Sequence, residues 1–144
     1  MSRNESSAAG HRLVPHTADL IIEAWAPTKL ACLEQAARAL VDSFAAVDDV
    51  AVTEPIPITL EMEEDEALLV SLLDEIIYVV DVLGSIPVRV TLEETEDGRI
   101  AGFFEVAPAV SVETHGALPK GVSLSDLMLA YEDGGWRCRA TIDV

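Results

Sequence analysis

Hydrophobic and polar residues repeat along the chain with two different periods, which separate predicted strands from predicted helices. After Asp19, apolar and polar residues alternate, and this predicts a strand that runs to Ala26. A helix is expected to begin at Thr28, an N-cap residue, and to continue to about Ala46. Its apolar residues recur at helical spacing: Leu30, Leu33, Ala37, Leu40, Val41 and Phe44.

The middle of the chain repeats this order of strand and helix. Residues 55–62 alternate strictly, and two prolines, Pro55 and Pro57, favour an edge strand because proline cannot donate a backbone hydrogen bond. A second helix is expected after Asp65, with Gly84 as its stop signal. One face of this helix is apolar: Leu68, Leu69, Leu72, Leu73, Ile76, Ile77 and Val80.

The period of two returns in the last part of the chain and predicts two hairpins. In the first, residues 88–92 pair with residues 100–106 around an Asp-Gly turn. In the second, residues 122–131 pair with residues 136–144 around an Asp-Gly-Gly turn. The whole order predicts an α+β fold in which two helices pack on a mostly antiparallel sheet.

The length of 144 residues allows one core and one domain. Residues 1–12 are polar and rich in serine, so we expect a disordered leader followed by a domain over residues 13–144. The sequence has no apolar signal region and no long apolar span, which favours a cytoplasmic protein without a membrane segment. Cys32 and Cys138 lie on apolar patterns and are expected to be inert core thiols.

The charge balance limits the classes of partner. Nine Lys and Arg residues stand against 26 Asp and Glu residues, a net charge of −17. A chain this acidic repels phosphate backbones, which argues against stable direct binding of nucleic acid. The same charge suits a basic protein partner and hard divalent cations such as Ca²⁺ or Mg²⁺.

Two acidic segments at opposite ends of the chain are candidates for metal chemistry. His16-Thr17-Ala18-Asp19 places an imidazole and a carboxylate just before a strand, where they could hold a metal or relay a proton. The same residues could equally form a structural turn. At the other end, Asp143 and the terminal carboxylate of Val144 are oxygen donors for a hard cation, and Asp19 would join them if the first and last strands are neighbours. A terminal aspartate alone is usually just solvated.

Basic and imidazole groups are scarce, with nine Lys and Arg and three His residues in the chain. Lys120, one of only two lysines, lies among small and apolar residues and could meet a phosphate or nucleotide. It could also be an ordinary surface lysine. His11 and His115 have no partner that the sequence identifies, and no role is assigned to them. The sequence contains no glycine-rich phosphate loop and no hydrolase or metalloprotease motif.

Taken together, these features resemble the archease family over residues 13–144. The shared features are the His16–Asp19 motif, the leucine-rich second helix, a lysine before the last hairpin and an aspartate beside the chain end. The resemblance implies a metal held by Asp19, Asp143 and Val144, with His16 as a possible outer-sphere residue, and a functional role for Lys120. This chain departs from the family where Leu124 and Ser125 replace an aromatic residue and a histidine, and where Pro15 replaces an acidic residue.

The resemblance also implies a function. Archeases help an RtcB-type RNA ligase to become guanylylated and to turn over repeatedly in tRNA splicing or RNA repair, and they carry a divalent metal, Ca²⁺, Mg²⁺ or Mn²⁺. On this reading the chain activates an enzyme and is not an enzyme itself. The alternatives are a small metal-dependent phosphoester hydrolase that uses His16 as a base, and a metal-binding scaffold that has lost ligase activation.

Overall fold

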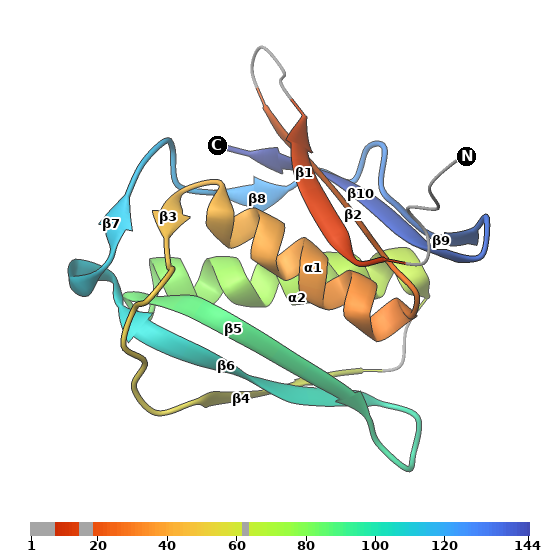
Figure 1. The fold of residues 1–144 in the computed structure, drawn as a ribbon, viewed down its shortest axis with the longest axis horizontal. Coiled ribbons are helices and arrows are strands. Elements are labelled where there is room, and N and C mark those ends of the chain that lie inside the picture. Colours follow the sequence, from red (N-terminus) through yellow and green to blue (C-terminus); the bar gives the residue numbers. More distant parts are fainter. Residues whose placement is uncertain (1–7, 15–18, 62–63) are drawn as a thin grey trace.

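Two helices lie between two antiparallel sheets (Figure 1). The structure is a computed structural model that describes residues 8–14, 19–61 and 64–144. The helices are α1 (Lys29–Asp42) and α2 (Asp65–Asp81), and they contact each other as well as both sheets. The predicted α+β class with two packed helices is therefore confirmed, although the strands form two main sheets.

The first sheet joins strands from the two ends of the chain. Its order is β1, β2, β10, and the far edge of β10 pairs with β8 near one end and with β9 near the other. The bounds of these strands are β1 (Gly10–Val14), β2 (Leu20–Ala26), β8 (Gly121–Val122), β9 (Met128–Glu132) and β10 (Gly135–Asp143).

The second sheet contains three strands in the order β4, β6, β5. As its prolines predicted, β4 lies at an edge, and β5 and β6 form the predicted hairpin. A short pair of strands, β3 and β7, and a single 3₁₀ turn, η2, complete the connections. The bounds are β3 (Ala45–Ala46), β4 (Ile56–Leu60), β5 (Ser85–Glu94), β6 (Ile100–Pro108), η2 (Ala109–Ser111) and β7 (Glu113–Thr114).

The apolar faces predicted from the sequence form the core between the sheets. Thr28 caps α1 as predicted, since its Oγ1 accepts a hydrogen bond from the amide of Ala31 at 3.2 Å. Helix α2 ends at Asp81, and Gly84, with a φ of +64°, follows its cap. The largest fully buried side chains come from both helices and both sheets: Phe44, Phe104, Ile22, Leu33, Leu40, Leu69, Leu72, Leu73, Ile76, Ile86, Ile142 and Val79.

Three predicted boundaries are wrong, and in each case backbone pairing explains the difference. Residues 10–12, assigned to the leader, belong to β1 because they pair with β2. The first helix ends at Asp42, since the next residues enter β3 and the carbonyl of Phe44 accepts a bond from the amide of His115 at 2.8 Å. The strand predicted over residues 122–131 is split into β8 and β9, and residues 123–127 leave the sheet.

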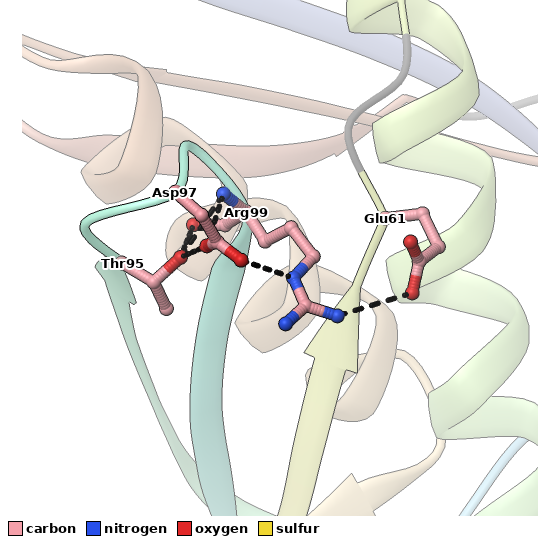
Figure 2. A network of polar contacts seen from close by, with 4 residues as sticks. All are labelled: Glu61, Thr95, Asp97 and Arg99. Carbon is pink, nitrogen blue, oxygen red and sulfur yellow. Dashed lines mark hydrogen bonds and ion pairs between the residues drawn. The ribbon is translucent and has the colours of Figure 1, made fainter.

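A local polar network closes the hairpin between β5 and β6 (Figure 2). The hydroxyl of Thr95 donates to Asp97, and Arg99 Nε donates to Asp97 Oδ2 at 3.1 Å. Arg99 also faces Glu61, just beyond the edge strand β4, at 3.8 Å. The Thr95 hydroxyl, opposed by slight desolvation and helped by Arg99, lowers the pKa of Asp97. The turn is therefore held by residues that are close in sequence.

No helix in the described part of the chain is long and apolar enough to cross a membrane. The longest, α2, has 17 residues and begins with two acidic side chains.

Candidate metal site at one end of the first sheet

The pairing of β2 with β10 brings the two ends of the domain together. Ile142 pairs with Leu20 in an antiparallel ladder, so Asp143 and Asp19 are the next residues on adjacent strands. The condition set by the sequence, that the first and last predicted strands be neighbours, is met. Two candidate carboxylates that are more than a hundred residues apart in the sequence thus lie at the same end of one sheet.

Strand β8 adds the candidate lysine to this end of the sheet. Asp143 pairs with Gly121, and the amide of Lys120 donates to the carbonyl of Asp143 at 2.7 Å. Pro119 is buried on one side of Lys120, while Lys120 itself is exposed. The backbone position of Lys120 is therefore fixed next to Asp143, and its exposed side chain lies at the same end of the sheet as the two aspartates.

The face on which Asp143 lies follows from the alternation of β10. Ile142 is fully buried against the helices, so Asp143 is on the outer face of the sheet, where it is exposed. A side chain built on Gly121 would have its Cβ 3.9 Å from Asp143 Oδ2, which places this carboxylate oxygen beside β8. Asp19 is half-buried, and Val144 is 37% exposed. These oxygens are open to water and to a hydrated ion.

The donor atoms at this end fit a hard cation. Asp19 and Asp143 offer carboxylates, and Val144 offers main-chain oxygen, the type of ligand that Ca²⁺ and Mg²⁺ prefer. The described residues contain no group of three His, Cys, Asp or Glu side chains placed to hold a metal. A site here therefore needs Val144 or a residue outside the described ranges as its third ligand. His16, the predicted outer-sphere residue, lies outside them.

A charged network crosses the outer face of the same sheet, and sequence reasoning missed it. Glu23 on β2 accepts from Arg12 Nε on β1 at 2.6 Å and from Arg139 on β10. Partial burial opposes ionisation of Glu23, but the hydrogen bonds and charges of Arg12 and Arg139 outweigh it and lower the pKa of Glu23. The alternation placed Glu23 and Arg139 on outer faces, but only the strand order makes them neighbours.

Two other sets of residues acquire partners that the sequence did not indicate. His11 lies between Gln35 Oε1, at 2.7 Å, and Asp42 Oδ2, at 2.9 Å, and so joins β1 to α1. Cys32 and Cys138 are buried as predicted, and their thiols also contact each other. The neighbouring Cys32 thiol, together with burial, raises the pKa of Cys138. These contacts fasten α1 to the sheet that carries the candidate site.

The fold and this sheet end define a class: a small acidic α+β domain that brings two carboxylates and one lysine from distant segments to the same end of a sheet. A model of the Archease protein family (MTH1598/TM1083) matches residues 11–144, and the chain belongs to that family. It is 41% identical over 138 residues to "Probable protein archease" of Mycobacterium tuberculosis, in two strains, a match that covers 96% of this chain and 76% of that protein.

Two solved structures share the fold. The solution structure of Methanobacterium thermoautotrophicum protein 1598 superimposes with a TM-score of 0.75 at 24% identity, covering 94% of this chain and 99% of that one. A crystal structure from Thermotoga maritima, described as an archease and possible chaperone, gives a TM-score of 0.65 at 19% identity, covering 91% of this chain and 94% of that one. At this level of identity, the likeness establishes the architecture.

Proposed function

We propose that this archease is an accessory protein that carries a divalent metal and activates an RtcB-type RNA ligase. The activation promotes guanylylation and repeated turnover of the ligase in tRNA splicing or RNA repair. Asp19, Asp143 and Val144 hold the ion, which is Ca²⁺, Mg²⁺ or Mn²⁺, and Lys120 contacts a nucleotide phosphate or the ligase. The chain itself performs no catalysis.

One observation carries this proposal, the meeting of three distant segments at one sheet end. Asp19 precedes β2, Lys120 precedes β8, and Asp143 ends β10, and backbone pairing places all three together. Neither the core nor the strand pairing requires these side chains, since Asp143 and Lys120 are both exposed. Oxygen donors and a lysine at one end of a sheet are chemistry suited to a phosphate group.

The acidic residues and the lysine have different roles that follow from their charges. A bound divalent ion would neutralise phosphate charge, a main requirement of phosphoryl transfer. Lys120 supplies a mobile positive charge beside the carboxylates, and its exposure lets it reach a phosphate in another protein's active site. The overall charge of −17 repels free RNA, which supports contact through a protein partner. The description of the Thermotoga maritima relative as a possible chaperone supports a role exerted on another protein.

A turnover assay with the ligase of the same source tests the proposal. The purified chain is added to that ligase with GTP and Mn²⁺, and ligated RNA is counted per ligase molecule. We expect the wild-type chain to raise the count above one, Asp143→Ala to abolish this effect, and Lys120→Ala to reduce it without changing metal affinity. Asp48→Ala, which removes an exposed aspartate between β3 and β4, is the matched control and should behave as wild type.

The other outcomes identify the alternatives. Turnover of a phosphoester by the purified chain without ligase would favour the hydrolase. Metal binding with no change in ligation would favour the scaffold. If stimulation survives in Lys120→Ala, the role assigned to this lysine is wrong even when the metal site is right.

A further inference from the structure

An open groove lies between the start of α2 and the connection that joins β8 to β9. Its volume is about 580 Å³. Ala67 and Val70 of α2 line one side, and Leu124 and Leu127 of the connection line the other. Glu64 and Glu66 stand at the beginning of the helix and also border the groove. The groove is therefore apolar between its walls and acidic at one end.

Leu124 extends this apolar surface into solvent. Its side chain is 78% exposed, whereas Leu127 and Val70 are half-buried. A single exposed leucine on a surface needs no explanation, but a leucine at the mouth of an apolar groove enlarges a contiguous patch. Burial of such a patch by a partner would release the water that covers it.

The charges around the groove specify the kind of partner. Glu64 and Glu66 are exposed, and within the described ranges neither of them pairs with a basic side chain. These carboxylates disfavour a phosphate backbone and favour Lys or Arg on the partner. A second copy of this chain, with only 9 Lys and Arg against 26 Asp and Glu, is poorly suited to supply them.

The groove is close to the candidate metal site along the same short segment. Lys120 immediately precedes β8, and Leu124 follows it after one intervening residue, so at most about 14 Å separates their Cα atoms. The amide of Ser123 donates to the carbonyl of Thr141 on β10 at 2.8 Å, which ties the start of the connection to the sheet. The groove and Lys120 of the candidate site therefore lie on one short segment that is tied to β10.

We propose that this groove receives a segment of a protein partner in which leucine-like side chains fill the apolar space and Lys or Arg side chains face Glu64 and Glu66. The groove itself is inferred from its shape and charge. The identification of the partner as the ligase rests on the proposed function above.

A synthetic peptide tests the chemistry of the groove without the ligase. The probe is an amphipathic peptide of leucine and lysine, compared with a version in which glutamate replaces lysine, and binding is followed by titration calorimetry. We expect the lysine peptide to bind and the glutamate peptide not to bind. Leu124→Asp should lower the affinity of the chain for the lysine peptide by about ten-fold or more, as loss of a central apolar contact does.

Val110→Asp is the matched control. Val110 is 98% exposed on η2, so this substitution adds the same charge to the same protein at another exposed apolar position. It should leave peptide binding unchanged. Equal affinity of the wild-type chain and Leu124→Asp for the lysine peptide, or equal weakening by both substitutions, would overturn the groove proposal.

A second arm uses the full chain and the ligase of the same source, and it separates the two proposals. Leu124→Asp should lose about ten-fold in affinity for the ligase while its affinity for Mn²⁺ stays that of wild type. If the ligase binds the wild type and Leu124→Asp equally, the groove proposal fails and the proposed function stands. If the ligase binds neither the wild type nor Leu124→Asp, the proposed function fails. The peptide experiment alone then tests the groove proposal.

Discussion

The two sheets that enclose the helices differ in how far apart their strands lie along the chain. In the second sheet, β5 and β6 are consecutive, and residues within a few positions of one another close their turn (Figure 2). In the first sheet, β2 pairs with β10, and Glu23 reaches across 116 positions to Arg139. The candidate site belongs to the sheet with distant strands, because only such a sheet can bring both ends of a domain to one place.

This difference assigns separate roles to the two sheets. In the second sheet, only the hairpin of β5 and β6 is closed locally, and the polar side chains at its turn bond one another. In the first sheet, β2 and β10 pair although both helices and the whole second sheet lie between them along the chain. Substitutions that act on the shared core should therefore affect both sheets, and substitutions on an outer face should affect only one.

The largest expected effect follows from a cavity in the shared core. Leu72 of α2 is fully buried, so Leu72→Ala should lower the free energy of unfolding by about 2–5 kcal/mol. Tyr78→Ala on the same helix removes a side chain that is 50% exposed and should cost much less. Urea unfolding followed by circular dichroism measures both. An unchanged midpoint for Leu72→Ala would contradict the assignment of this helix to the core.

The next effect should be confined to the first sheet. Asp143→Ala and Asp19→Ala should each weaken Ca²⁺ and Mn²⁺ binding, because each removes a charged ligand. Loss of an outer-shell partner costs roughly 10-fold in metal affinity, and these substitutions should cost more. Asp97→Ala, on the hairpin of the second sheet, is the control and should bind as wild type. Titration calorimetry of the folded variants decides, and wild-type affinity in both sheet-end variants would place the site elsewhere.

A smaller effect should appear as a difference in acid stability. The pKa of Glu23 is lowered in the folded state from an ordinary value of 4.5, so the unfolded chain binds its proton more readily. The stabilisation by Glu23 is therefore present above about pH 4.5 and is lost as the pH falls through the lower, folded value. Glu23→Gln should flatten the fall in unfolding midpoint below pH 4.5. Glu105→Gln, which breaks an exposed ion pair on the second sheet, should flatten this fall less. Equal flattening by the two substitutions would contradict the difference drawn between the two sheets.

The smallest effect should come from the turn of the second sheet. Asp97→Asn removes an exposed charge whose partners, Thr95 and Arg99, lie within two residues. We expect the unfolding midpoint at neutral pH and the metal affinity to remain within error of wild type, because surface substitutions outside special features change little. A clear loss of stability would show that the contact of Arg99 with Glu61 matters to β4.

Much of the fold was predictable because its signals are local. The cap at Thr28, the apolar face of α2 and the Asp-Gly turn before Arg99 depend on neighbours within one turn of helix or one hairpin. The wrong boundaries lie where backbone pairing with a distant segment decides. Residues 10–12 look like a leader until β2 pairs with them, and nothing in residues 122–131 marks where the strand leaves β10.

The candidate site was predictable only as a conditional statement. Asp19, Lys120 and Asp143 are notable in the sequence for their residue type and position, and a site was expected if the first and last strands were neighbours. The structure meets that condition and adds Lys120 through β8. The metal ligands and the role of Lys120 remain predictions. The Glu23 network carried no such signal, because a charged residue on an outer strand face is ordinary.

The sequence by itself determined where both helices and most of the longer strands lie, which of their faces are buried, and that the chain is acidic. These properties depend on side-chain periodicity and composition, which are set along the chain. Only the tertiary structure decided that β10 lies between β2 and β8, that two cysteines meet in the core, and that a groove opens beside Leu124. Those features arise from pairing between segments far apart in the chain, and that pairing depends on how the whole core packs rather than on any local pattern.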